Sequence, residues 1–264
     1  FTYNKGLPLS IRSIFYPLLG DRAWGWPGHI IDILAVLATL FGLATSLGLG
    51  AQQASAGINH VFGTDGGVGA QLLVIIGVTL LAIISVVRGI DGGVKVLSNI
   101  NMLIAFALLL FVGLVGFAVA IGNVPNTVMG YVENIIPLSN PHGREDETWM
   151  HGWTVFYWAW WISWSPFVGM FIARVSRGRT IREFLIAVLL IPTAVTILWM
   201  SIYGGIAIDQ VVQGVGSLGV NGLTDVPMAM FQMLDELPMS SVLSFLAVVL
   251  VLVFFITSSD SGSL

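Results

Sequence analysis

The sequence predicts an all-α polytopic membrane protein, and its composition is the first observation behind this prediction. Of the 264 residues, 56% are hydrophobic and only 9% are charged. A soluble domain carries about 25% charged residues, so this chain has too few to cover a water-facing surface. The composition therefore excludes a soluble domain and a disordered chain, and the net charge of −4 also excludes a nucleic-acid binder.

The second observation is a series of long apolar stretches. A membrane-spanning helix needs roughly 20 mainly apolar residues. None of the stretches alternates with a period of two residues, as the strands of a barrel do, so we expect helices. The six predicted spans cover residues 30–56, 69–88, 97–122, 151–173, 184–208 and 240–258. Between the third and fourth spans, residues 124–138 are predicted to form either an amphipathic helix on the outer face or an ordered loop.

The third observation is the sorting of basic residues among the connecting segments. In an alternating topology, all but one of the 10 Lys and Arg residues lie on the same side of the membrane, and Arg144 alone lies on the other. The positive-inside rule makes the basic side cytoplasmic. The chain starts at Phe1 without a signal-peptide pattern and stops at Leu264 within or just past an apolar stretch. We therefore expect an internal piece of a larger protein.

The fourth span is unusually rich in tryptophan. Trp160, Trp161 and Trp164 lie near its middle, too deep for the aromatic belt at the membrane interface. Offsets of one, three and four residues place their indoles on one arc of a helix. Such an arc suits a desolvated quaternary ammonium, which ring faces attract without a costly buried anion. It equally suits packing between helices, and the residues alone leave both interpretations open.

A proline interrupts the same span. Pro166 has no N–H to donate, and its ring clashes with the carbonyl of Ile162, so Ser165 and Pro166 predict a kink or a helix break. Transporters place substrate and ion sites at broken helices near the membrane midplane, although a kink can also serve packing alone. Beside the indoles we favour the functional interpretation.

Hydroxyl groups supply candidate oxygen ligands for sodium. Thr257 and Ser258 follow Phe254 at the cytoplasmic end of the last span, and Thr39 lies on the first span. Hydroxyls in membrane helices usually bond back to their own backbone, so this signal is weak by itself. The histidines show no metal-ligand spacing, and no convergent polar set suggests an enzyme. The glycines of the first span, such as Gly42 and Gly50, are predicted to let another helix approach closely.

Two segments of the chain resemble the signature of the betaine/carnitine/choline transporter family. They are the run Tyr-Trp-Ala-Trp-Trp-Ile-Ser-Trp-Ser-Pro-Phe-Val-Gly from Tyr157 and the run Ala-Arg-Val-Ser-Arg-Gly-Arg-Thr-Ile-Arg-Glu from Ala173. Shorter runs that begin at Asp32, Ala38, Ser46 and Phe254 are similar to other family blocks, so the resemblance covers essentially the whole chain. It implies a transporter of twelve spans whose core is an inverted-repeat bundle of the LeuT type. By the order of its motifs, this chain resembles spans five to ten, six helices of a partial bundle.

The resemblance also implies roles for individual residues. Trp160, Trp161 and Trp164 match the box around a trimethylammonium group, with Phe167 nearby. Phe254, Thr257 and Ser258 match a sodium site. A proposed second sodium site matches Thr39 and Phe167, but Leu43 stands where a second hydroxyl often occurs.

The function implied by the resemblance is secondary active transport. We expect import of a quaternary ammonium compatible solute, with glycine betaine favoured, by sodium symport with alternating access. A proton-coupled choline or carnitine transporter of the same family is the alternative. Sodium is the expected coupling ion, and no cofactor is expected. The implied setting is the bacterial inner membrane, where the expected partners are the solute, the lipid bilayer and further copies of the chain in a trimer.

Overall fold

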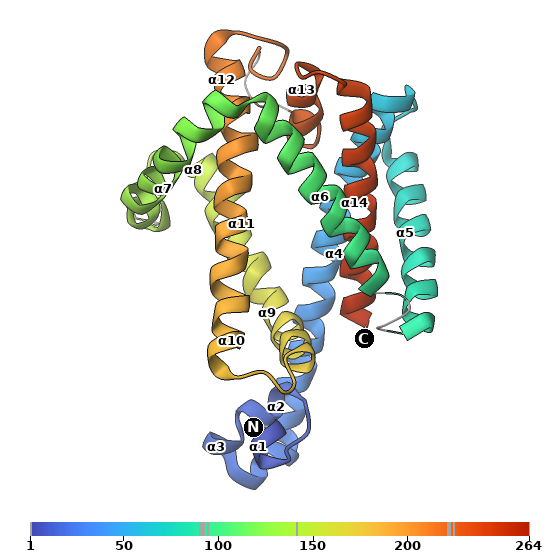
Figure 1. Ribbon diagram of the computed structural model, residues 1–264. Coiled ribbons are helices and arrows are strands. Elements are labelled where there is room, and N and C mark those ends of the chain that lie inside the picture. The colour runs from blue at the N-terminus through green and yellow to red at the C-terminus, as the bar shows by residue number, and fades with distance from the viewer. Residues whose placement is uncertain are drawn as a thin grey trace. The chain divides into compact units, whose positions relative to one another are not determined.

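The computed structural model describes residues 2–89, 93, 95–140, 142–220, 223 and 225–263. This part of the chain is helical and contains no β-strand (Figure 1). The chain divides into two compact units. Unit 1 comprises Phe1–Ser46 and Pro137–Ile186, and unit 2 comprises Leu47–Ile136 and Ala187–Leu264.

The helices follow one another with short connections. The short helices before the first long one are α1 (Thr2–Lys5), α2 (Ile11–Ile14) and α3 (Tyr16–Leu19). The long helices of the first half are α4 (Trp26–Phe62), α5 (Val68–Gly89), α6 (Lys95–Val115) and α7 (Phe117–Ser139). The second half contains α8 (Glu147–Trp149), α9 (Phe156–Val175), α10 (Ile181–Leu185), α11 (Ile191–Trp199), α12 (Gly205–Gln213), α13 (Ala229–Asp235) and α14 (Ser240–Ser263). The π-helical turns Met150–Val155, Ile186–Leu190 and Met200–Gly204 join α8 to α9, α10 to α11 and α11 to α12.

Five helices of the described chain are long and apolar enough to cross a membrane. They are Trp26–Phe62, Val68–Arg88, Lys95–Val115, Ile181–Gln213 and Ser240–Ser259. Each contains or overlaps one of the predicted spans. The remaining predicted span, 151–173, lies on the helical run from α8 through α9. Its tryptophans, serines and proline lower its hydropathy, so its crossing of the membrane stays a prediction.

The turn between α6 and α7 falls inside the predicted third span, 97–122, whose end stays a prediction. Helix α6 ends at Val115 and α7 begins at Phe117, with a turn at Gly116. A Cβ on Gly116 would lie 2.4 Å from Cδ1 of Ile206, so glycine allows the close approach of α12. The segment 124–138, for which the sequence left a helix and a loop open, lies inside α7.

A small apolar cluster joins α5 to α14, and the main core of unit 2 forms where α6, α12, α13 and α14 meet. Phe231 and Val112 are completely buried there, and Ala247 of α14 is 1% exposed. Gly57 makes room for Phe231, since an added Cβ would lie 2.3 Å from the Cζ atom of that ring. Close van der Waals packing of this kind stabilises contacts between membrane helices, because lipid tails are as apolar as the side chains that they would replace.

Polar contacts at the ends of its helices help to hold unit 1 together. The hydroxyl of Tyr3 donates to the carbonyl of Ala173 at 2.9 Å, near the end of α9. Arg12 forms an ion pair with Asp32 of α4. The start of α10 is closed by a capping box, in which Thr180 and Glu183 bond reciprocally to each other's backbone N–H.

Candidate solute site on helix α9

One face of α9 carries a continuous row of aromatic side chains. We call Tyr157, Trp160, Trp164, Phe167 and Phe171 the aromatic row. Successive ring centroids in the row are 5.6, 6.1, 5.9 and 6.1 Å apart. These side chains recur three or four residues apart, so the helical period stacks them along one face.

Helix α4 holds the middle of the row within unit 1. The indole N–H of Trp160 donates to the carbonyl of Gly42 and to the hydroxyl of Ser46, each at 3.2 Å. Trp164 lies against Gly42, where an added Cβ would be 3.1 Å from the indole Cδ1. Ser46 is only 3% exposed. The two central indoles are therefore positioned by a short stretch of small residues on α4.

The predicted set of three tryptophans is divided by the structure. Trp160 and Trp164 are stacked with an interplanar angle of 21°, and Phe167 contacts Trp164 in the same row. Trp161 makes no ring contact with another described residue, and its side chain is 59% exposed. One residue corresponds to about 100° around a helix, so Trp161 lies beside the row rather than in it. The structure thus brings Trp160, Trp164 and Phe167 together and leaves Trp161 apart from them.

Of the kink or break predicted at Ser165 and Pro166, the break does not occur, because α9 runs through both residues, and the kink stays a prediction. Proline cannot donate a hydrogen bond to the carbonyl of Ile162, but the Ser165 hydroxyl donates to that carbonyl at 2.8 Å. This side-chain bond replaces the missing backbone bond, so the helix continues through the proline. The helix departs from α geometry upstream instead, in the π-helical turn Met150–Val155.

The candidate sodium ligands lie on two helices and in both units. On α14 in unit 2, Thr257 is buried and its hydroxyl donates to the carbonyl of Phe254 at 2.8 Å, while Ser258 is half-buried. In unit 1, the Thr39 hydroxyl donates to the carbonyl of Ala35 at 2.8 Å. These are the local bonds that hydroxyls commonly make in membrane helices. Each hydroxyl oxygen keeps lone pairs that can bind a cation, and the sodium assignment stays a prediction.

Arg144 is occupied by local contacts. Its guanidinium forms an ion pair with Asp146, donates to the carbonyl of Leu138 at 2.8 Å and lies 5.1 Å from the ring centroid of Trp149. The hydrogen bond from Arg144 lowers the pKa of the Asp146 carboxyl below its ordinary value. This basic residue therefore organises its own loop beside α8.

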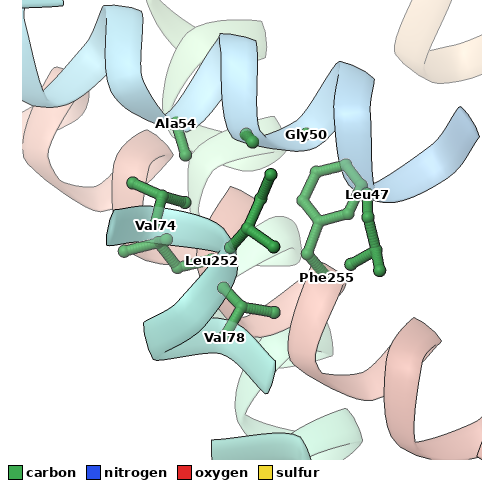
Figure 2. A pocket seen from close by; sticks show the side chains of 9 residues that line it. Leu47, Gly50, Ala54, Val74, Val78, Leu252 and Phe255 are labelled. Carbon is green, nitrogen blue, oxygen red and sulfur yellow. The ribbon is translucent and has the colours of Figure 1, made fainter. Parts of the chain in front are cut away.

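A small cavity in unit 2 has a different character from the aromatic row. It is bounded by α4, α5 and α14, and Figure 2 shows the side chains that line it. Leu252 and Phe255 of α14 point toward Gly50 and Ala54 of α4. All of its lining residues are apolar. The side chains that line the cavity therefore offer neither an oxygen ligand nor a hydrogen-bond partner for a solute or an ion.

From the sequence, Gly42 was predicted only to let another helix approach closely, and neither Gly42 nor Ser46 was assigned to the solute site. A signal was present, because the two small residues are four positions apart and so share one face of α4. Nothing in the sequence showed that this face meets α9.

Comparison with known proteins decides the family. The family model described as BCCT, betaine/carnitine/choline family transporter, matches residues 1–264. The chain belongs to this family. As a family member it is a multi-pass membrane protein, and the family's activity is transport rather than enzymatic catalysis.

Three relatives show how close the similarity is. Glycine betaine transporter 1 of Vibrio parahaemolyticus is 76% identical over 264 residues, which are 100% of this chain and 50% of that protein. A glycine betaine/proline/choline/ectoine transporter of the same organism is 71% identical over 100% of the chain and 47% of that protein. The glycine betaine transporter OpuD of Bacillus subtilis is 48% identical over 100% of the chain and 52% of that protein. The chain spans about half the length of these relatives.

Proposed function

We propose that the protein to which this chain belongs imports a quaternary ammonium solute, glycine betaine, by sodium symport with alternating access. The observation that carries the proposal is the aromatic row of α9, whose central indoles α4 holds through Gly42 and Ser46. The names of the similar proteins as glycine betaine transporters support the choice of solute.

The chemistry of the row suits this solute class. A trimethylammonium group has no N–H, so it cannot donate hydrogen bonds and gains little from polar side chains. Ring faces attract it instead, by about 2 kcal/mol or more for a desolvated contact. Helix α9 contains no acidic residue, so the row offers such a cation π-faces without a fixed anion.

For the coupling ion, the proposal uses oxygen atoms on α14. The carbonyl of Phe254 and the hydroxyls of Thr257 and Ser258 are ligands of the type that hard cations prefer. A second position at Thr39 and Phe167 belongs to the same proposal. The alternative solute and ion are choline and protons, and the relative named as a glycine betaine/proline/choline/ectoine transporter favours keeping choline as a candidate.

The experiment uses the full-length protein in proteoliposomes with radiolabelled betaine, choline or carnitine. We expect betaine uptake that requires an inward sodium gradient. Betaine uptake that is indifferent to sodium would overturn the coupling, and proton-driven choline uptake without betaine uptake would replace the proposal with its alternative.

The site itself is tested by tryptophan variants in the same assay. We expect Trp160→Ala and Trp164→Ala each to raise the betaine KM about 30-fold, the equivalent of about 2 kcal/mol of cation–π energy. Trp161→Ala measures whether an indole beside the row also contacts the solute. Trp158→Ala is the matched control, because Trp158 is 56% exposed on the same helix and lies outside the predicted box. Unchanged betaine affinity in both row variants would refute the site.

A further inference from the structure

The indole N–H of Trp160 is fully engaged by helix α4. Tryptophan has a single donor and no acceptor. That donor is shared between the carbonyl of Gly42 and the hydroxyl of Ser46, at equal distances of 3.2 Å. The N–H edge of the ring therefore faces α4, and only the ring faces of Trp160 remain for a ligand.

The Ser46 hydroxyl is arranged to accept this bond. It donates its own proton to the carbonyl of Gly42 at 3.1 Å, which directs its lone pairs away from that carbonyl. Ser46 is buried, so water does not compete for the indole. The neighbouring Thr45 gives an internal comparison. Its hydroxyl makes the same kind of backbone bond, to the carbonyl of Phe41 at 2.9 Å, and has no aromatic partner among the described residues.

A hydrogen bond at the N–H edge restricts rotation of the indole about its side-chain bonds. The attraction of a cation to an aromatic ring depends on the cation lying over the ring face, so the orientation of the ring sets the strength of the contact. Trp164 stacks on Trp160 with ring centroids 6.1 Å apart, so an orientation imposed on one indole is passed to the other.

We infer that Ser46 is a positioning residue of the solute site: its hydroxyl orients the Trp160 indole so that the ring face is presented to the quaternary ammonium group. Ser46 acts through Trp160 and need not touch the solute. The inference rests on the proposed function, since it concerns the affinity of the same site for the same class of solute.

The test replaces the hydroxyl while keeping the rest of α4. Ser46→Ala removes one of the two acceptors, and Gly42 still accepts from the indole, so the local packing is kept. The loss of one buried hydrogen bond predicts a rise in the betaine KM of about three- to tenfold with little change in kcat. Ser46→Thr keeps the hydroxyl and should return the KM toward the wild-type value, and Thr45→Ala is the matched control without an indole partner.

A spectroscopic measurement follows the orientation of Trp160 without any solute. The full-length protein is labelled with 5-fluorotryptophan, and Trp160→Phe identifies the fluorine signal of Trp160. We expect Ser46→Ala to shift this signal and Thr45→Ala to leave it in place. Uptake of betaine by the same variants then links the shift to affinity.

The outcomes separate the two proposals. An unshifted fluorine signal in Ser46→Ala overturns the inference, and so does a shifted signal with an unchanged KM. A loss of activity that appears mainly in kcat and is not restored by Ser46→Thr indicates a structural role and also overturns it. Wild-type protein that binds no betaine refutes the proposed function and the solute half of the inference, while the fluorine signal still decides whether Ser46 orients Trp160.

Discussion

Helix α4 uses small residues in two different ways along its length. The first part of α4 ends at Ser46 and belongs to unit 1. There the indoles of Trp160 and Trp164 pack against Gly42 and Ser46. In the second part of α4, from Leu47, glycines receive phenylalanine rings within unit 2. There Gly50 meets Phe255, and Gly57 meets Phe231.

The difference lies in the polar atoms at the contact. Both parts admit a large ring where a side chain is missing, as is common between membrane helices. Only the first part also offers acceptors to the ring, the Gly42 carbonyl and the Ser46 hydroxyl, so it determines orientation as well as distance. The second part borders a cavity whose lining residues are all apolar, and close packing is its main contribution. Small residues of α4 therefore serve a candidate site in the first part and stability in the second.

The largest effect that we predict tests the second part of α4, where glycines pack against phenylalanine rings. In Gly50→Ala the new Cβ would lie 2.1 Å from ring atoms of Phe255, so the ring or the helix must move. We expect the free energy of unfolding to fall by about 1–3 kcal/mol, as in overpacked cores. Thermal denaturation of the full-length protein in detergent measures this change.

Gly48→Ala is the control for this prediction. Apart from the backbone of α4 itself, no atom of the described residues lies within 4 Å of a Cβ added at Gly48, two residues earlier on the same helix. Alanine favours a helix over glycine by about 1 kcal/mol, so Gly48→Ala should leave stability unchanged or raise it. Equal losses of stability in the two variants would show that packing at Gly50 is not special.

A prediction of intermediate size tests the first part of α4, where Gly42 packs against Trp164. In Gly42→Ala the new Cβ would lie 3.1 Å from Cδ1 of Trp164, a contact that a small shift of the indole can relieve. We expect a stability loss of about 1 kcal/mol or less. Because the shift moves an indole of the row, the betaine KM should rise several-fold, whereas Gly50→Ala should leave it near the wild-type value. We therefore expect the larger rise in KM in Gly42→Ala and the larger loss of stability in Gly50→Ala. Uptake and thermal denaturation of both variants measure the two effects, and a larger KM change in Gly50→Ala would contradict the assignment of the site to the first part of α4.

The fold was largely predictable because apolar length has a direct physical cause in the thickness of the bilayer. The turn at Gly116, inside the third predicted span, was not predicted. Apolar residues continue past Gly116 to Ile121, so hydropathy alone shows no boundary, and the contact that an added Cβ at Gly116 would make is with Ile206 of another helix.

The site was only partly predictable from the sequence. Helical spacing placed Trp160, Trp161 and Trp164 on one arc of the helix. This arc is wide enough to hold both the aromatic row and Trp161, which lies beside the row. Contact with α4 distinguishes Trp160 and Trp164 from Trp161. This could not be predicted, because the hydrogen bond between Trp160 and Gly42 joins residues 118 positions apart in the chain. The continuity of α9 at Pro166, by contrast, depends on a neighbour in the sequence. The hydroxyl of Ser165 bonds to the carbonyl that proline leaves without a donor, so this effect was predictable from the sequence.

The smallest effects that we predict concern the charged contacts near the two ends of α4. Asp32 accepts from both the side chain and the backbone N–H of Arg12, whereas His60 meets Asp235 through one ring nitrogen at 2.9 Å. Partly exposed pairs contribute up to about 1 kcal/mol. Arg12→Gln should therefore lower the free energy of unfolding by less than that amount, and His60→Gln by less still, because glutamine can donate to Asp235. Denaturation at low and high salt measures both, since salt screens the ion pair. Arg22→Gln, on an exposed residue before α4, is the control, and a larger loss in His60→Gln than in Arg12→Gln would reverse the predicted order.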